Sequence, residues 1–178
     1  NLRFANTPWV FVGFGNYVDA ITDDARWLNA LRVTLTITVS SLIAEFALGM
    51  VFALVMNQSF QGRALVRASI LIPWSLTTVV SARMWQVIYH ASYGVFNRIL
   101  VDLGVIETYK PWIISPVFTI WAMIGADVWK TTPFVALLLT AGMQLIPSEL
   151  YEAAAIDGAT AWDRFWNITF PLLRPTML

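Results

Sequence analysis

Residues 33–56, VTLTITVSSLIAEFALGMVFALVM, form an apolar run in which Glu45 is the one charged residue. A helix needs about 20 apolar residues to cross the roughly 30 Å hydrocarbon core of a bilayer, so this run is long enough to span it. Backbone groups in lipid must bond to one another, and a helix does this within one segment. The sequence therefore predicts an all-α membrane protein.

The composition supports a membrane environment and excludes several classes of function. The chain is 58% hydrophobic and 12% charged, which is more apolar than a soluble domain of this length usually is. Its 11 basic residues balance its 11 acidic ones, so it lacks the basic surface that nucleic-acid binding requires. Without cysteine and with His90 as the one histidine, it has no thiolate or zinc motif. We expect a lipid membrane as a partner, no nucleic acid and no metal.

Two further runs are long and apolar enough to cross a bilayer, at about residues 64–89 and 112–146. The first contains Pro73 and is the weaker prediction. The second is longer than a perpendicular crossing needs and contains Pro133, so we expect it to tilt, to kink or to extend beyond the lipid. A further apolar run starts at about residue 168, and we expect it to be the beginning of an incomplete span.

Residues 1–32 mix prolines, glycines and charges, which fits neither a signal peptide nor a span. We expect the true N-terminus to be missing. Residues 33–178 carry no internal repeat and are predicted to form one membrane domain.

A different pattern, IPSELYEAAAIDG at residues 146–158, follows the third run. It predicts a short helix with Ser148 as its N-cap, ended by Gly158, because glycine tolerates the left-handed conformation of a C-terminal turn. Thr160 and Asp163 have the spacing of a capping box and predict the start of a second helix. The segment therefore predicts two short helices joined by a bend.

The second of these helices has an aromatic face, because Trp162, Phe165, Trp166 and Thr169 are spaced for one side of a helix. Such a face, beside an alanine-rich surface, suits close docking against a partner. The alternative is an amphipathic helix pair that lies on the membrane surface.

This segment resembles the EAA loop of ABC importer permeases. The shared features are Glu152-Ala153-Ala154, Gly158, Ile168 and Phe170-Pro171, where the usual pattern ends in Leu-Pro. The resemblance implies a cytoplasmic loop, at about residues 147–167, that sits in a groove of a separate ATPase subunit. The coupling residues it implies are Glu152, Ala153, Ala154, Asp157, Gly158, Trp162 and Phe165.

Three other stretches resemble the maltose-type sugar permeases: Phe11 to Tyr17, the Asn57 to Arg67 turn, and Ala141 to Pro147. This resemblance implies a type I permease bundle in the cytoplasmic (inner) membrane. The chain would hold the second to fourth of six core spans and the start of the fifth, with residues 1–32 extracytoplasmic. The implied partners are a dimer of ATP-binding subunits, a second permease, an extracytoplasmic sugar-binding protein and a sugar. The chain itself would hold no cofactor, because ATP and Mg²⁺ belong to the ATPase.

Inside the third run, Asp127, Lys130, Thr131 and Phe134 fall on one helix face. A charge at the centre of a span costs about 2.5–3.5 kcal/mol on insertion scales, so these charges should face protein, water or solute. The resemblance points to Asp127, Trp129, Thr131 and Phe134 as lining the sugar path, and Lys130 shares their face. The alternative is an Asp127–Lys130 ion pair that joins helices without touching substrate.

The sequence has no Gly-x-x-x-x-Gly-Lys-Ser/Thr phosphate loop, so we expect no ATPase site and no enzymatic activity in this chain.

Three alternatives to a sugar permease stay open. A permease for another solute, such as glycerol phosphate, a polyamine or an amino acid, is the first alternative. An ion-coupled secondary transporter, with Glu45, Asp127 and Lys130 as relay, is the second. A structural membrane scaffold is the third. For Glu45 and Arg83 we favour a structural role, as an interhelical pair or a water-facing residue.

Overall fold

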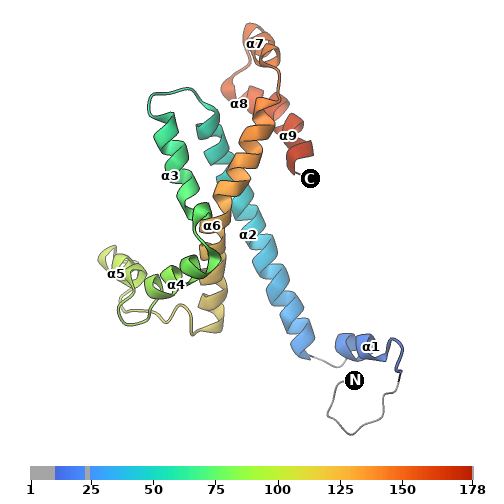
Figure 1. The fold of residues 1–178 in the computed structure, drawn as a ribbon, viewed down its shortest axis with the longest axis vertical. Helices are drawn as coiled ribbons and strands as arrows, with labels where there is room; N and C mark the ends of the chain where they lie inside the picture. Colours follow the sequence, from blue (N-terminus) through green and yellow to red (C-terminus); the bar gives the residue numbers. More distant parts are fainter. Residues whose placement is uncertain (1–10, 23–24, 178) are drawn as a thin grey trace. The chain divides into compact units, whose positions relative to one another are not determined.

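The protein is all-helical over the residues that the structure, a computed structural model, describes, namely 11–22 and 25–177, and this confirms the predicted fold class (Figure 1). Contacts divide the chain into two units, Asn1–Thr38 and Val39–Leu178, and α2 belongs in part to each. Residues 1–10, 23–24 and 178, which belong to the predicted N-terminal segment and the incomplete span, lie outside the described residues. The helices are α1 Gly15–Thr22, α2 Ala25–Asn57, α3 Arg63–Ser75, α4 Thr78–Ile88, α5 Val95–Asp102, α6 Pro116–Gln144, α7 Ser148–Ile156, α8 Ala161–Arg164 and α9 Phe170–Met177, with a π-helical turn, η1, at Phe165–Thr169.

Two of the described helices are long and apolar enough to cross a membrane alone: residues 26–57 of α2, and α6. The α6 helix is shorter than the predicted run, because it begins at Pro116 rather than near Trp112. Proline suits the first position of a helix, where its missing N–H has no intrahelical partner to lose. The helix continues through Pro133, and its 29 residues extend about 43 Å at 1.5 Å per residue, more than a perpendicular crossing needs.

The predicted span over residues 64–89 is not one continuous helix. It consists of α3 and α4, which meet at an angle of 92° as a broken span or a re-entrant loop. The residues at the break have extended backbones, with ψ of 140° at Leu76 and 147° at Thr77. Pro73 has no N–H for the carbonyl one turn before it, and the Ser75 hydroxyl donates to the Ile72 carbonyl at 2.8 Å. The last turn of α3 therefore has the hydrogen bonds of a helix end rather than those of a continuing helix.

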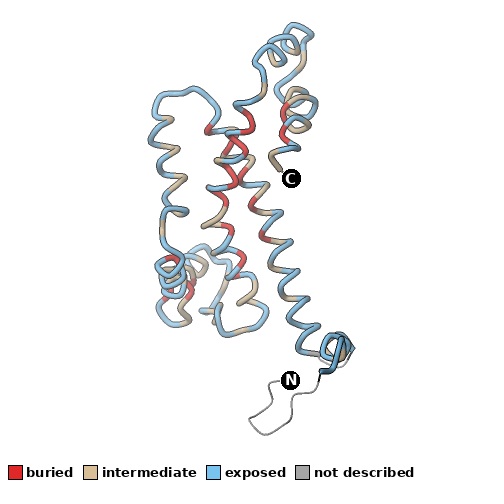
Figure 2. Tube along the Cα trace, turned by 45° about the vertical axis from the view of Figure 1, so that its right-hand side comes forward, coloured by how far each residue is buried: buried red, intermediate tan, exposed pale blue. Residues whose placement is uncertain are grey.

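The core of the second unit lies where α6 meets residues of α2 and α9, and buried positions follow α6 along most of its length (Figure 2). Small residues bring the helices close together. A Cβ added at Gly49 would lie 2.8 Å from the Val135 Cγ1 atom, and one added at Gly142 would lie 2.8 Å from Leu173 Cδ2. The buried cluster comprises Ala53, Val135, Leu139, Met143 and Leu173.

The connection from α4 through α5 to α6 is organised by one buried polar side chain. Asn97 is fully buried, and its amide nitrogen donates to the carbonyls of His90 at 3.3 Å and Lys110 at 3.0 Å. Its amide oxygen accepts from the Lys110 N–H at 2.9 Å and the Trp112 Nε1–H at 2.8 Å. One side chain thus holds together three points of a connection that has little regular structure.

Candidate functional site

The first helix of the predicted coupling segment is α7, which ends just before the predicted glycine. Asp157 is its C-cap and Gly158 has φ of +81°. A Cβ at Gly158 would meet no atom within 4 Å, so backbone conformation rather than space favours glycine here. The predicted ending of this helix is confirmed.

The two helix starts differ in outcome. Ser148 is not the N-cap: Pro147 holds that position with ψ of 133°, the helix begins at Ser148 itself, and there is no side-chain cap bond at this end. The capping box of the second helix is confirmed, since Thr160 Oγ1 accepts from the Asp163 N–H at 3.2 Å and Asp163 Oδ2 accepts from the Thr160 N–H at 2.9 Å. The Thr160 hydroxyl also donates to Asp163 Oδ2, and this bond, followed by the one from the Thr160 N–H, lowers the pKa of the Asp163 carboxyl.

The segment from α7 to η1, residues 148–169, forms a helical hook that extends past the end of α6 (Figure 1). The Tyr151 hydroxyl and Thr169 Oγ1 are 2.9 Å apart and join the hook's two arms. Its outer residues stay open: Ile156 is 87% exposed and Trp162 69%, while Glu152 and Asp157 are also exposed. Sequence reasoning missed Tyr151, because nothing in the local pattern links it to a residue eighteen positions away.

The aromatic face of the hook differs from the predicted one by a single residue. Trp166 contacts Trp162 at 5.6 Å and Phe165 at 5.2 Å between ring centroids, and also Phe170 at 5.1 Å. Thr169 was predicted on this face but is buried. The physical reason is the π-helical turn η1, whose wider turn shifts the residues after it, so Phe170 takes the predicted place of Thr169.

The predicted substrate-path residues differ in their exposure and in their contacts. Asp127 is exposed and Thr131 is half-buried. The Lys130 Nζ atom donates to the carbonyl of Leu76 at 2.7 Å, and within the described part of the chain no ion pair joins it to Asp127. The described residues thus form no Asp127–Lys130 pair, and the interhelical bond of Lys130 goes to Leu76. Phe134 stacks on Trp74 with ring centroids 5.8 Å apart and remains 41% exposed.

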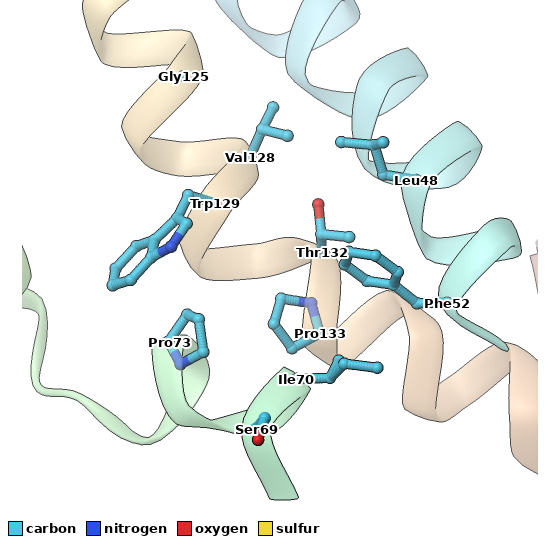
Figure 3. A pocket seen from close by; sticks show the side chains of 10 residues that line it. All are labelled: Leu48, Phe52, Ser69, Ile70, Pro73, Gly125, Val128, Trp129, Thr132 and Pro133. Carbon is cyan, nitrogen blue, oxygen red and sulfur yellow. The ribbon is translucent and has the colours of Figure 1, made fainter. Parts of the chain in front are cut away.

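Trp129 faces elsewhere. Its ring meets Trp85 of α4 edge-on at 5.6 Å, and it lines a cavity of about 500 Å³ between α2, α3 and α6 (Figure 3). The structure thus separates Trp129 from the face of Phe134. The residues that line the cavity are Leu48, Phe52, Ser69, Ile70, Pro73, Gly125, Val128, Trp129, Thr132 and Pro133.

Two other charged residues of the apolar runs, Glu45 and Arg83, differ in their exposure. Glu45 is buried on α2. Arg83 is exposed on α4, where it donates to Gln86 Oε1 at 3.0 Å, so it bonds within its own helix. Arg67, to which the sequence assigned no role, donates from Nε to the Met56 carbonyl at 3.0 Å and closes the turn between α2 and α3.

Comparison with known proteins gives one family and several relatives. The family described as "Binding-protein-dependent transport system inner membrane component" matches residues 45–178. The trehalose/maltose transport system permease protein MalF of Thermococcus litoralis is 46% identical over 168 residues, which cover 94% of this chain and 56% of that protein. The trehalose transport system permease protein SugA of Mycobacterium tuberculosis is 38% identical, with coverages of 94% and 52%. The chain spans about half the length of these curated relatives.

A solved structure is also similar over nearly the whole chain. It is a bacterial alginate ABC transporter in complex with an alginate pentasaccharide-bound periplasmic protein. One of its chains superposes with a TM-score of 0.82 at 27% identity, covering 93% of this chain and 57% of that one.

Proposed function

Because the chain belongs to the family of binding-protein-dependent transport system inner membrane components, we propose that it is the membrane-spanning part of a permease subunit that imports a sugar at the expense of ATP. The names of the similar permeases support a sugar as the solute: trehalose and maltose in one and trehalose in the other. The proposed partner proteins follow from the same family membership. An extracytoplasmic binding protein delivers the sugar, and a second permease completes the cavity.

The observation that carries the proposed coupling is the exposed, internally bonded helical hook. Ile156 and Trp162 are large apolar side chains left mostly in the open at its outer surface. Such a patch favours a protein partner that covers it. In the proposed complex this partner is the ATPase subunit, the hook lies on the cytoplasmic side, and residues 1–32 lie on the extracytoplasmic side.

In this mechanism a displacement of the hook is transmitted to the membrane-spanning helices. The α7 helix follows α6 after a short link at residues 145–147, and the other arm of the hook continues through η1 into α9. Leu173 of α9 packs in the core with Met143 of α6. A displacement of the hook therefore moves α6 and α9 together. ATP binding by two ATPase subunits drives the displacement, since this chain has no phosphate loop.

The proposed sugar path runs along the face of α6 that carries Asp127, Thr131 and Phe134. A sugar offers hydroxyls that form hydrogen bonds and a C–H face that packs on aromatic rings. The Thr131 hydroxyl and the exposed part of the Phe134 ring supply both kinds of contact. Alternating access would expose this face to one side of the membrane at a time.

The proposal is tested with the full-length permease, expressed with its candidate partners and reconstituted in proteoliposomes with trehalose or maltose. We expect an ATPase and a second permease to copurify, and uptake to stop when internal ATP is depleted. Uptake that instead stops when the proton gradient is collapsed would contradict the proposal and favour a secondary transporter. Uptake of glycerol phosphate or a polyamine in place of sugar would correct the solute and leave the mechanism in place.

Replacement of Thr131 by Val and of Phe134 by Ala should each lower sugar uptake about 3- to 10-fold while basal ATPase activity stays the same. Each change removes a hydrogen bond or a ring contact of about 1 kcal/mol, and 1.4 kcal/mol corresponds to a factor of ten. Initial rates of uptake and ATP hydrolysis are measured on the same vesicles. Trp121→Ala is the control, because Trp121 is 59% exposed on α6 but off this face. Unchanged uptake in both variants would remove the sugar-path assignment.

A further inference from the structure

The contact between Lys130 and the break of α3 and α4 assigns this lysine a role that its position in the sequence does not suggest. We propose that Lys130 is a positioning residue: its ammonium group holds the bend between α3 and α4 against α6, and so sets the direction in which α4 leaves the bundle. The effect on transport rests on the proposed function, whereas the effect on the bend does not.

The bend needs a donor at the point where the lysine supplies one. Leu76 is the C-cap of α3, with φ of −72° and ψ of 140°, and α4 starts two residues later in a direction 92° away. The carbonyls at the end of a helix have no intrahelical donor. Where such a carbonyl lies within the hydrocarbon core, no water supplies the missing donor. The Lys130 Nζ atom, 2.7 Å from the Leu76 oxygen, satisfies it.

The charge of the lysine suits this position as well as its N–H groups do. The C-terminal end of a helix carries partial negative charge, and a cation there is favourable. A charged donor also makes a shorter and stronger bond than a neutral one. Lys130 is half-buried and contacts a residue 54 positions away, so it is a long-range interhelical contact rather than a local cap.

Aromatic contacts flank this bond on both helices. Phe134, one turn after Lys130 on α6, stacks on Trp74, which lies two residues before Leu76, and the two ring planes differ by 12°. On the other side of the break, Trp129 meets Trp85 of α4. The ring contacts pack α3 and α4 against α6, while the lysine bonds to the break between them. Loss of the lysine should therefore loosen the angle between α3 and α4 and leave both helices packed on α6.

The experiment measures that angle in the full-length permease, assembled with its partner subunits in lipid nanodiscs. Spin labels are placed at Val87→Cys on α4 and Leu145→Cys at the end of α6, both exposed positions in a stretch that has no cysteine of its own. Lys130→Met should shift or broaden the distance distribution measured without sugar. Lys130→Arg, which keeps a charged donor, should restore it. Lys110→Met is the matched control and should change nothing, because Lys110 uses its backbone in the Asn97 contacts.

A distance distribution that Lys130→Met leaves unchanged would overturn the proposal, whatever happens to transport. If that variant does not assemble, Lys130→Gln is decisive in the same way, because its shorter neutral amide should give a partial shift. A raised sugar KM with unchanged distances would mean that Lys130 binds solute, and would also overturn it. With a shift present, we expect the sugar-stimulated ATPase rate to fall about tenfold and basal ATPase to persist. If the unsubstituted complex shows no ATP-driven uptake, the proposed function fails and the distance result still decides the role of Lys130.

Discussion

Gly158→Val is expected to abolish ATP-driven uptake and to release the ATPase subunit from the permease. Gly158 has φ of +81°, a conformation that costs a residue with a Cβ about 1–2 kcal/mol and a β-branched residue more. The backbone at position 158 would relax toward negative φ and change the angle between α7 and α8. The hook would then no longer fit the ATPase subunit. Copurification of the ATPase and initial uptake rates are the two measurements, and we expect both to fall at least tenfold.

The controls separate the bend from the mere presence of a side chain. Asparagine tolerates the left-handed region, and no atom lies within 4 Å of a Cβ here, so Gly158→Asn should keep most of the assembly and uptake. Gly104→Val carries a similar conformational cost at φ of +71°, on the connection between α5 and α6. It should leave the ATPase bound. Full assembly and transport with valine at position 158 would end the proposed role of the hook as a lever.

The parts of the hook that could be predicted from the sequence are those fixed by neighbouring residues. Gly158 as a helix end and Thr160 with Asp163 as a capping box depend on backbone groups within three or four positions, so their spacing is sufficient evidence. The π-helical turn has no comparable signal. It became visible only in the structure, where Thr169 is buried against Tyr151 and Phe170 joins the aromatic face.

The bundle shows the same limit at longer range. Apolar runs gave the existence of α2 and α6, because length and composition decide whether a helix can span a bilayer. The break at Leu76 was missed, since Pro73 within a helix signals a weak point but not the angle that follows. The partner of Lys130 is a backbone carbonyl 54 residues away, and a single sequence carries no signal for such a contact. For Lys130 itself, the expectation that a charge within the span faces protein, water or solute agrees with its bond to the Leu76 carbonyl.

Asn97→Leu should destabilise the connection between α4 and α6 by about 3 kcal/mol or more. Leucine is close to asparagine in size but has no polar atoms, so four hydrogen bonds are lost at a site with no exposed surface. Each buried group left without a partner costs about 1–3 kcal/mol, and here they include the Lys110 N–H and the Trp112 indole N–H. The thermal midpoint of the purified protein in detergent should fall by roughly 6–12 °C, by the scaling for a chain of this size.

The comparison with an exposed asparagine isolates the buried network. Asn57→Leu makes the same replacement at the exposed end of α2, and surface changes of this kind usually stay within about 0.5 kcal/mol. Limited proteolysis locates the effect, because loss of the Asn97 contacts should open residues 90–112 to cleavage and leave the hook intact. This pattern follows from position: Asn97 bonds only to the connection that precedes α6, while the hook follows α6 and is held by Tyr151 and Thr169. A midpoint unchanged by Asn97→Leu, or cleavage that appears first in the hook, would show that packing around α5 rather than this one amide holds the connection together.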